Sequence, residues 1–168
     1  MSDQTTLNDL LRLASGPNPA RSYRALRDLA EHAQSPGGLQ FLREALEDKE
    51  RNIRWAAARA LGMAGDAAIP AYDQLKALLR DPYQPIQWAA AHALRDLGRA
   101  SPGRVVPRLI DALSDPEDNV RWGAARALGE IGPMARDAVA TLSGMENDKA
   151  GWVQWVAQWA LFRIDEAQ

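Results

Sequence analysis

The chain has 168 residues, of which 46% are hydrophobic and 25% are charged. This composition is typical of a folded globular protein and excludes an intrinsically disordered one. The 20 basic and 22 acidic side chains give a net charge of −2, and there is no cysteine. The chain therefore has no overall basic field for nucleic acid or a membrane surface, and disulfide frameworks, cysteine–zinc sites and thiol catalysis are excluded.

One pattern recurs about every 33 residues along the chain. A tryptophan occupies the same place in four stretches, at positions 55, 88, 122 and 155, each two residues after Ile or Val and each followed by small residues. A fixed period in this range indicates stacked supersecondary units. We count five units in a single domain of residues 1–168, with approximate boundaries 1–35, 36–67, 68–103, 104–136 and 137–168.

The first unit departs most from the pattern at its turn. Aligned on the tryptophans, Tyr23 takes the aromatic place and Arg27 follows four residues later. The stretch Gly16-Pro17-Asn18-Pro19 fills the turn where every later unit carries an aspartate. A terminal repeat is expected to be atypical because one of its faces meets water.

Each later unit is predicted to contain two helices, and no strand-like alternation competes with them. The first helices are expected at Gly38–Leu46, Ile69–Leu79, Val105–Leu113 and Ala138–Met145, with a proline near the first turn in two of them. A tight turn follows, with an aspartate at one column: Asp48, Asp81, Asp115 and Asp148. The second helices carry the tryptophans and are expected to end at left-handed caps on Gly65, Gly98 and Gly132. The fold class is therefore all-α.

The second helix has an apolar face and an aromatic residue opposite it. At about 100° per residue, Ala57 and Leu61 lie on the same side as Ile53, whereas Trp55 and Arg59 lie together on the other side. Each unit thus pairs an aromatic residue with a cation or second aromatic one turn later. The pairs, which we take as candidate partner-binding residues, are Tyr23/Arg27, Trp55/Arg59, Trp88/His92, Trp122/Arg126 and Trp155/Trp159.

These residues carry a resemblance. The pattern Leu-x-x-Leu-x-Asp, a short turn and Val/Ile-Arg-x-Ala-Ala-Ala-x-Ala-Leu-Gly resembles HEAT repeats, closest to the short type first associated with phycobilisome lyases, and residues 105–138 match it best. The resemblance implies an α-solenoid of about five helix-turn-helix repeats whose second helices line the concave side, with the tryptophans inside the groove. The family includes scaffolds, lyase subunits, a diiron hydroxylase and DNA glycosylases, so it specifies the fold more closely than the function.

The resemblance also implies a ladder of hydrogen bonds between units, made by the turn aspartate and the arginine six residues later. Asp48 with Arg54 and Asp115 with Arg121 match this pattern. Gln87 and Gln154 replace the arginine in alternate units, and we expect the loss of charge to interrupt the ladder.

The sequence shows no catalytic, metal or cofactor motif. The diiron enzymes that share the resemblance need His-Glu pairs in several repeats, whereas neither His32 nor His92 is followed by glutamate. Glu130 is the nearest carboxylate to the tryptophan side, and a single carboxylate at a helix end is usually solvated. We expect no catalytic residue, no metal, no cofactor and no enzymatic activity. With no signal-peptide or membrane-spanning pattern, the expected location is cytoplasmic.

Two interpretations of the tryptophans remain. They can fill the inner curve between adjacent units, or they can form an amphipathic row for a partner, since tryptophan and arginine dominate binding hot spots. The last unit adds Trp152 and Phe162. Either its aromatic residues close the end of the solenoid against each other, or that end pairs with another chain, since an exposed apolar patch usually marks an interface. We favour closure, with part of the aromatic row extended.

We favour a protein-interaction module or scaffold that binds an acidic and apolar peptide or helix of another protein. The alternatives are nucleic-acid binding of the DNA-glycosylase type, which the acidic isoelectric point disfavours, and a phycobilin lyase or chaperone-like role. No membrane association is expected, and the sequence does not define the oligomeric state.

Overall fold

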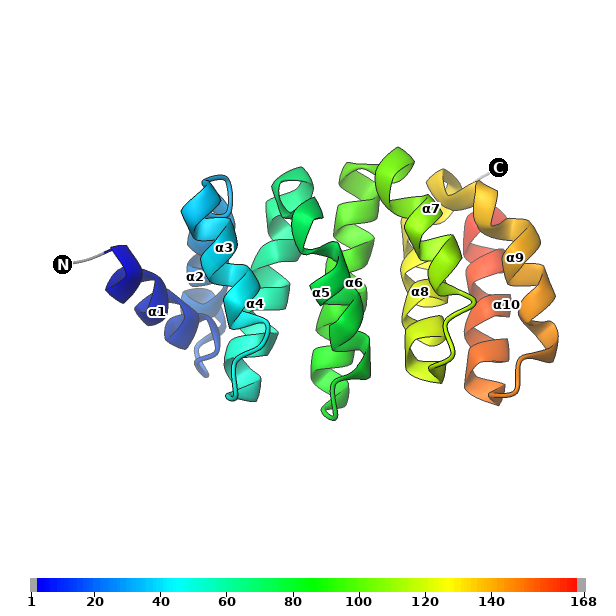
Figure 1. Cartoon of the computed structure of the whole chain (residues 1–168), viewed down its shortest axis with the longest axis horizontal. Coiled ribbons are helices and arrows are strands. Elements are labelled where there is room, and N and C mark those ends of the chain that lie inside the picture. Colours follow the sequence, from blue (N-terminus) through cyan, green and yellow to red (C-terminus); the bar gives the residue numbers. More distant parts are fainter. Residues whose placement is uncertain (1–2, 166–168) are drawn as a thin grey trace.

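The computed structural model describes residues 3–165, and every regular element in this range is helical (Figure 1). The helices are stacked in pairs along the longest axis of the molecule, with the first and last pairs at opposite ends. The chain is an all-α solenoid of about five helix-turn-helix repeats, as the sequence predicted.

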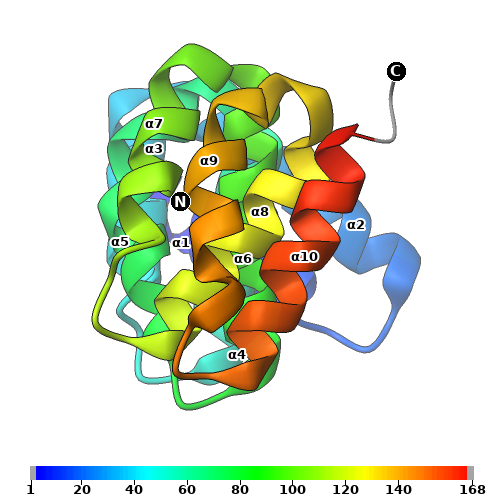
Figure 2. The same cartoon turned by 90° about the vertical axis from the view of Figure 1, so that its right-hand side faces the viewer.

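The repeats form two layers, which Figure 2 shows from the end of the solenoid. The first helices are α1 (Asp3–Ala14), α3 (Pro36–Ala45), α5 (Tyr72–Ala77), α7 (Pro102–Ala112) and α9 (Val139–Gly144). The second helices are α2 (Pro19–His32), α4 (Arg51–Ala64), α6 (Gln84–Ala100), α8 (Asp118–Ile131) and α10 (Gly151–Asp165).

The core lies between the layers and between neighbouring second helices. Ala56, Ala57, Ala58 and Ala60 of α4 are all fully buried, as is Leu61. Small side chains on several faces let α4 lie close to its neighbours, so the alanine runs permit the stacking of the repeats.

One side-chain hydrogen bond recurs in all five repeats and defines their common register. The residue just before each aromatic position donates to the backbone carbonyl six residues earlier, at 2.6–2.9 Å. Ser22, one of these donors, bonds to the carbonyl of Gly16. Ser22 and Gly16 therefore occupy the places that arginine or glutamine and the turn aspartate hold in later repeats. The donors in chain order are Ser22, Arg54, Gln87, Arg121 and Gln154.

The turn aspartates fold the backbone that leads into the second helices. Each of the four carboxylates accepts a hydrogen bond from the backbone N–H two residues later, at 2.7–3.1 Å. This Asx turn explains why one column holds aspartate. The first repeat uses Asn18 instead, whose side chain accepts a bond from the Arg21 N–H at the start of α2.

Two first helices are broken where the sequence predicted continuous ones. The expected helix Ile69–Leu79 is divided into the 3₁₀ segment η1 (Gly65–Ala71), α5 and the 3₁₀ segment η2 (Leu78–Arg80). The expected Ala138–Met145 is likewise divided among η3 (Gly132–Ala138), α9 and η4 (Met145–Asn147). Pro70 lies inside η1 and has no N–H for the helical ladder, which favours the tighter segment there.

In the fourth repeat, the proline lies further inside the first helix than the sequence predicted. Helix α7 begins at Pro102, about one turn earlier than expected, because the Ser101 carbonyl accepts bonds from the N–H groups of Arg104 and Val105. Pro107 therefore lies inside the helix and not in its first turn.

Two of the three predicted glycine caps end their helices at positive φ, although their ψ angles of −130° and −140° lie outside the left-handed helical region, and the third cap is absent. Gly65 and Gly132 end α4 and α8 with φ angles of +59° and +73°. Helix α6 instead continues through Gly98 to Ala100. A Cβ at Gly98 would lie 2.3 Å from Cδ1 of Ile131 in α8, so this glycine permits close helix packing.

Candidate partner-binding surface

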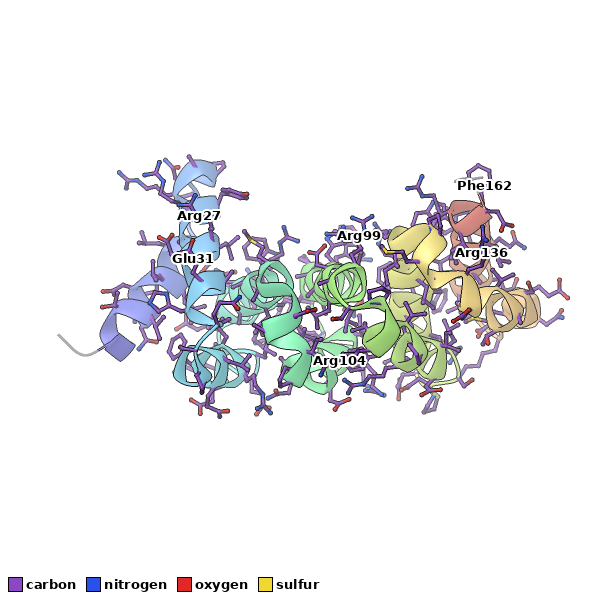
Figure 3. The ribbon with its side chains drawn as sticks, turned by 90° about the horizontal axis from the view of Figure 1, so that it is seen from above. Arg27, Glu31, Arg99, Arg104, Arg136 and Phe162 are labelled. Carbon is purple, nitrogen blue, oxygen red and sulfur yellow. The ribbon has the colours of Figure 1, made fainter. Side chains whose placement is uncertain are left out.

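The second helices form the concave face of the solenoid. In the view from above, Arg27 of α2 and Phe162 of α10 lie near the upper edge of the picture at the two ends of the solenoid. Arg99 of α6 lies lower, between them (Figure 3). Arg104 of α7 is on the opposite, convex side. The layer that carries the tryptophan column, Trp55, Trp88, Trp122 and Trp155, is thus the one that curves inward.

The tryptophan column is only partly covered by neighbouring repeats. Trp88 and Trp155 are 46% and 62% exposed, and Tyr23 at the same place in the first repeat is 64% exposed. Trp55 and Trp122 are half-buried and pack against the core, as does Trp159. The aromatic row is therefore open to solvent at alternate positions, and is not sealed between the units.

The residues one turn after the aromatic positions differ in their exposure and in their ionic contacts. Arg27 is exposed on α2 near Asp28 and Glu31, at 3.8 and 3.9 Å. Arg59 is half-buried, and within residues 3–165 it has no hydrogen bond or ion pair. His92 and Arg126 are both engaged by Glu130. The regular pairing in the sequence therefore gives side chains that differ in exposure and in ionic partners from one repeat to the next.

Glu130 organises the middle of the concave face. Its carboxylate accepts a hydrogen bond from Arg95 of α6 at 2.8 Å and lies 2.9 Å from Nη2 of Arg126, and Nε2 of His92 is 3.7 Å away. Arg99 also donates to the backbone carbonyl of Glu130. This candidate acid is thus an ion-pair centre that joins α6 to α8. The sequence analysis did not single out Arg95, and its position 35 residues before Glu130, about one repeat, is the signal that could have suggested the contact.

Arg126 is held between two indoles. Its guanidinium carbon lies 5.7 Å from the Trp122 ring and 5.8 Å from the Trp159 ring, both within cation–π range. Trp159 also covers Gly129, where a Cβ would lie 2.6 Å from Cζ3 of the ring. Trp159 and Arg126 therefore join α8 to α10.

The surroundings of His92 favour the uncharged form of its imidazole. Burial lowers the pKa of His92 below its ordinary value of 6.5, and the nearby arginines Arg95, Arg126 and Arg59 lower it further, against the opposing effect of Glu130. This position therefore favours a positive charge less than the equivalent arginine positions of other repeats do.

Positive charge prevails on the C-terminal halves of α4, α6 and α8. The carboxylates there are Asp96 and Glu130, and both contact Arg95. Because arginines outnumber carboxylates, this part of the surface is basic although the whole chain has a net charge of −2. The arginines are Arg59, Arg95, Arg99 and Arg126.

Two hollows open along the N-terminal ends of the second helices. A smaller one of about 280 Å³ lies at the starts of α6, α8 and α10 and is lined by Gln84, Gln87, Trp88, Asn119, Trp122 and Trp152. A larger one of about 620 Å³ adjoins Trp55. We call the larger hollow the Trp55 cleft. Its charged and aromatic neighbours Arg51 and Tyr83 were not singled out from the sequence, although Arg51 lies one turn before Trp55.

Neither a metal cluster nor a membrane span is found in the described part of the chain. No group of three or more histidine, aspartate or glutamate side chains among residues 3–165 is arranged to hold a metal ion. No described helix combines the length and the apolar character needed to cross a bilayer.

The stacked pairs, the curved second-helix layer and the recurring turn bonds define an α-solenoid repeat protein. The family model of HEAT repeats matches residues 7–95 and again residues 73–161. The chain belongs to the HEAT-repeat family. A search of curated proteins found no match.

Solved structures show the same architecture. An engineered protein is 26% identical over 98% of this chain and 80% of its own, with a TM-score of 0.50. The complex of CpcE and CpcF of phycocyanin lyase from Nostoc sp. PCC7120 is 19% identical, covers 94% of this chain and 99% of its own, and has a TM-score of 0.62. Kap121p is 21% identical over 98% of this chain but only 21% of its own, with a TM-score of 0.61. At the identities of the last two, the likeness concerns the fold alone.

Proposed function

We propose that this chain is a non-enzymatic protein-interaction module whose concave face binds a segment of another protein. The observation that carries the proposal is the open aromatic row, in which Trp88 and Trp155 expose large indole surfaces on the inward-curving layer. Indoles combine apolar area with a polar N–H, and they are enriched at the centres of protein interfaces.

The charges on this face define the chemistry of the partner. Arg59 has no carboxylate partner among the described residues, and the surface around Arg95 and Arg99 carries more arginines than acids. Guanidinium groups bind carboxylates through charge-assisted hydrogen bonds. A partner segment with apolar and acidic side chains therefore fits the face better than a basic one.

The contacts of Glu130 support a binding role over catalysis. A general acid or base must be able to exchange its proton with a substrate. Glu130 instead contacts Arg95 and Arg126 at 2.8 and 2.9 Å and is 15% exposed. This arrangement stabilises the carboxylate as a structural ion-pair partner.

Affinity capture followed by quantitative mass spectrometry tests the proposal. The wild-type chain and the double variant Trp88→Ala/Trp155→Ala are immobilised in parallel, with Arg104→Glu on the convex side as the control. We expect proteins retained by the wild type and by the control to be lost with the double variant, while circular dichroism shows unchanged helicity. Equal retention by all three would reject the concave face as the binding surface.

Nucleic acid is a separate outcome with its own measurement. A fluorescein-labelled DNA duplex is titrated at low and at moderate salt. A DNA affinity that is measurable at low salt and falls steeply as salt is added would indicate that the partner is a polyanion and not a protein segment. Binding to a polyanion releases counterions, which causes this dependence on salt. We expect no measurable affinity, because the chain as a whole has a net charge of −2 and offers no extended basic field to a polyanion.

A further inference from the structure

The Trp55 cleft lies where the first repeat is not tied to the second in the way that later repeats are tied to one another. In the second repeat, Arg54 reaches forward to Asp81 of the third at 2.7 Å. Ser22 takes the arginine position in the first repeat, and its short side chain bonds only within its own repeat, to the carbonyls of Leu13 and Gly16. No ion pair of the described residues joins the first turn to Asp48. The space between α2 and α4 therefore remains open at this end.

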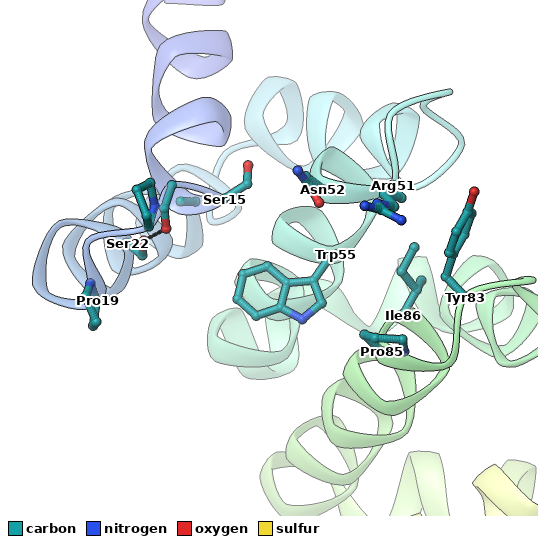
Figure 4. A pocket seen from close by; sticks show the side chains of 12 residues that line it. Ser15, Pro19, Ser22, Arg51, Asn52, Trp55, Tyr83, Pro85 and Ile86 are labelled. Atoms are coloured by element: carbon teal, nitrogen blue, oxygen red, sulfur yellow. Dashed lines mark hydrogen bonds between the residues drawn. The ribbon is translucent and has the colours of Figure 1, made fainter.

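The walls of the cleft are mainly apolar and rigid. Figure 4 shows the Trp55 indole between Pro19 and Ser22 on one side and Pro85 and Ile86 on the other. The prolines and the helix starts fix the backbone of these walls. The lining residues are Ala14, Ser15, Gly16, Pro17, Pro19, Ser22, Arg51, Asn52, Trp55, Tyr83, Pro85 and Ile86. An apolar hollow of about 620 Å³ is large enough to receive a bulky side chain.

Arg51 is the only charged side chain among the residues that line the cleft. Its guanidinium carbon lies 5.2 Å from the centre of the Tyr83 ring, which holds the cation at the rim without neutralising it. Arg51, Trp55 and Arg59 are four residues apart along α4, so they share one side of that helix. Two cations thus flank the indole, and no carboxylate lines the cleft.

We propose that the Trp55 cleft anchors the partner segment by enclosing one of its bulky apolar side chains. The carboxylate of an adjacent residue in the same segment binds Arg51. This inference rests on the proposed function and names the contact that determines the partner. The cleft is continuous with the concave face, since Trp55 belongs both to the cleft and to the tryptophan column. A segment anchored there can extend along the face toward Trp88, with Arg59 available to a second acidic residue.

The test uses random 12-residue peptides displayed on phage and selected on the full-length protein. We expect enriched peptides to carry an aromatic or large aliphatic residue beside Asp or Glu. A synthetic peptide of the enriched sequence is then titrated by fluorescence anisotropy. Arg51→Glu, an exposed change that leaves the core intact, should weaken binding at least about tenfold, and Trp55→Ala should weaken it more. Arg104→Glu on the convex side is the matched charge-reversal control and should change the affinity less than about twofold.

A second titration isolates the carboxylate contact. A peptide in which Asn or Gln replaces the acidic residue should bind the wild type about tenfold more weakly, yet lose little further affinity with Arg51→Gln, because the two changes remove the same interaction. If replacing the acidic residue of the peptide weakens binding to the wild type and to Arg51→Gln by the same factor, the pairing of Arg51 with that acidic residue is overturned. Circular dichroism and thermal unfolding of each variant show that a loss of affinity is not a loss of fold.

The results also separate this inference from the proposed function. Peptides that lose binding with Trp88→Ala or Trp155→Ala but bind Arg51→Glu and Trp55→Ala normally would overturn the anchor and leave the concave-face proposal standing. A selection that yields no peptide with a dissociation constant below about 100 μM would count against both. Peptides enriched in basic or purely polar residues would overturn the anchor, because they match neither the cation nor the apolar walls.

Discussion

Arg80 donates from Nη2 to both carboxylate oxygens of Asp115, at 2.8 and 2.9 Å, and so ties the turn of the third repeat to the turn of the fourth. The sequence pattern predicted an interruption here, because Gln87 replaces the arginine that makes this link elsewhere. Gln87 in fact bonds only to the carbonyl of Asp81 in its own turn. Arg80, just before that aspartate, supplies the missing connection, so the expected interruption is wrong.

The other two links of the ladder are more deeply buried. Arg54 pairs with Asp81 of the next repeat, and Arg121 pairs with Asp148, both at 2.7 Å. The side chains of Arg121 and Asp148 are only 7% and 10% exposed, whereas Arg80 is 42% exposed. The hydrogen bond from Arg121 lowers the pKa of Asp148. Links of the same geometry should therefore contribute unequally to stability.

Replacing Arg121 by Gln tests this inequality. The glutamine can still bond to the carbonyl of Asp115, as Gln87 and Gln154 do in their turns, but it leaves the Asp148 carboxylate buried without its cation. We expect the free energy of unfolding to fall by about 3 kcal/mol. Arg80→Gln should cost less, about 1 kcal/mol, because Arg80 is 42% exposed and water can take its place at the Asp115 carboxylate, which is itself 10% exposed. Urea unfolding of both variants measures the difference, and equal losses would mean that burial does not distinguish the links.

Gly98 offers a test of helix packing. Its substitution by alanine should destabilise the protein by about 1 kcal/mol, because the buried Ile131 side chain, whose Cδ1 is 2.3 Å from the Cβ position, must move, and this cost exceeds the gain in helix propensity. Gly103 in α7 is the control, since nothing lies within 4 Å of its Cβ position. Gly103→Ala should stabilise by about 0.5 kcal/mol through the unfolded chain. A stabilising Gly98→Ala would show that the Ile131 side chain can move aside without cost.

The repeat period and the apolar stripe were sufficient to predict the fold because they are local and recur several times. Cap positions depend on single contacts between repeats. Gly98 has the same spacing from its tryptophan as Gly65 and Gly132, yet it packs against Ile131 inside a longer helix. The break at Pro70 likewise depends on how η1 is placed on α4 and α6, which no pattern within one repeat encodes.

Helical spacing predicted which of the candidate residues share a side of one helix, but it could not predict the contacts between helices. Helical spacing places Trp122 and Arg126 on one face, and their rings and charges do meet. The same spacing cannot reveal that Glu130 and Trp159 engage Arg126 from two different directions. The Trp55 cleft also escaped prediction, because it lies at a link that the first repeat lacks.

The environment of His92 predicts a dependence of stability on pH. Because the pKa of His92 is lowered in the folded protein, the unfolded chain binds the proton more tightly. The free energy of unfolding should therefore be highest above the unfolded pKa of about 6.5 and should fall as the pH drops through the folded value. Urea unfolding between pH 7.5 and pH 5 measures this, and NMR of the imidazole gives the folded pKa directly.

Two substitutions assign that dependence to one residue. His92→Gln should reduce the loss of stability between pH 7.5 and pH 5, because the group that takes up the proton is gone. His32→Gln, which removes the other histidine, is measured in parallel so that the two histidines are compared in one assay. An unchanged pH profile in His92→Gln would contradict the role of burial and of the surrounding arginines.

The exposure of the aromatic residues predicts which of them can be removed without loss of stability. Trp88→Ala and Trp155→Ala should each cost less than about 1 kcal/mol, since their indoles are 46% and 62% exposed. Trp122→Ala should cost about 2 kcal/mol, because it removes a half-buried ring that packs on the core and supports the Arg126 guanidinium at 5.7 Å. Thermal and urea unfolding should therefore separate the two exposed positions from Trp122.

If the partner segment occupies the concave face, Trp88→Ala and Trp155→Ala will weaken its binding while the unfolding curves stay close to the wild type. A large loss of stability at Trp88 would instead mean that its ring is a packing residue, and the aromatic row would then be part of the core between repeats.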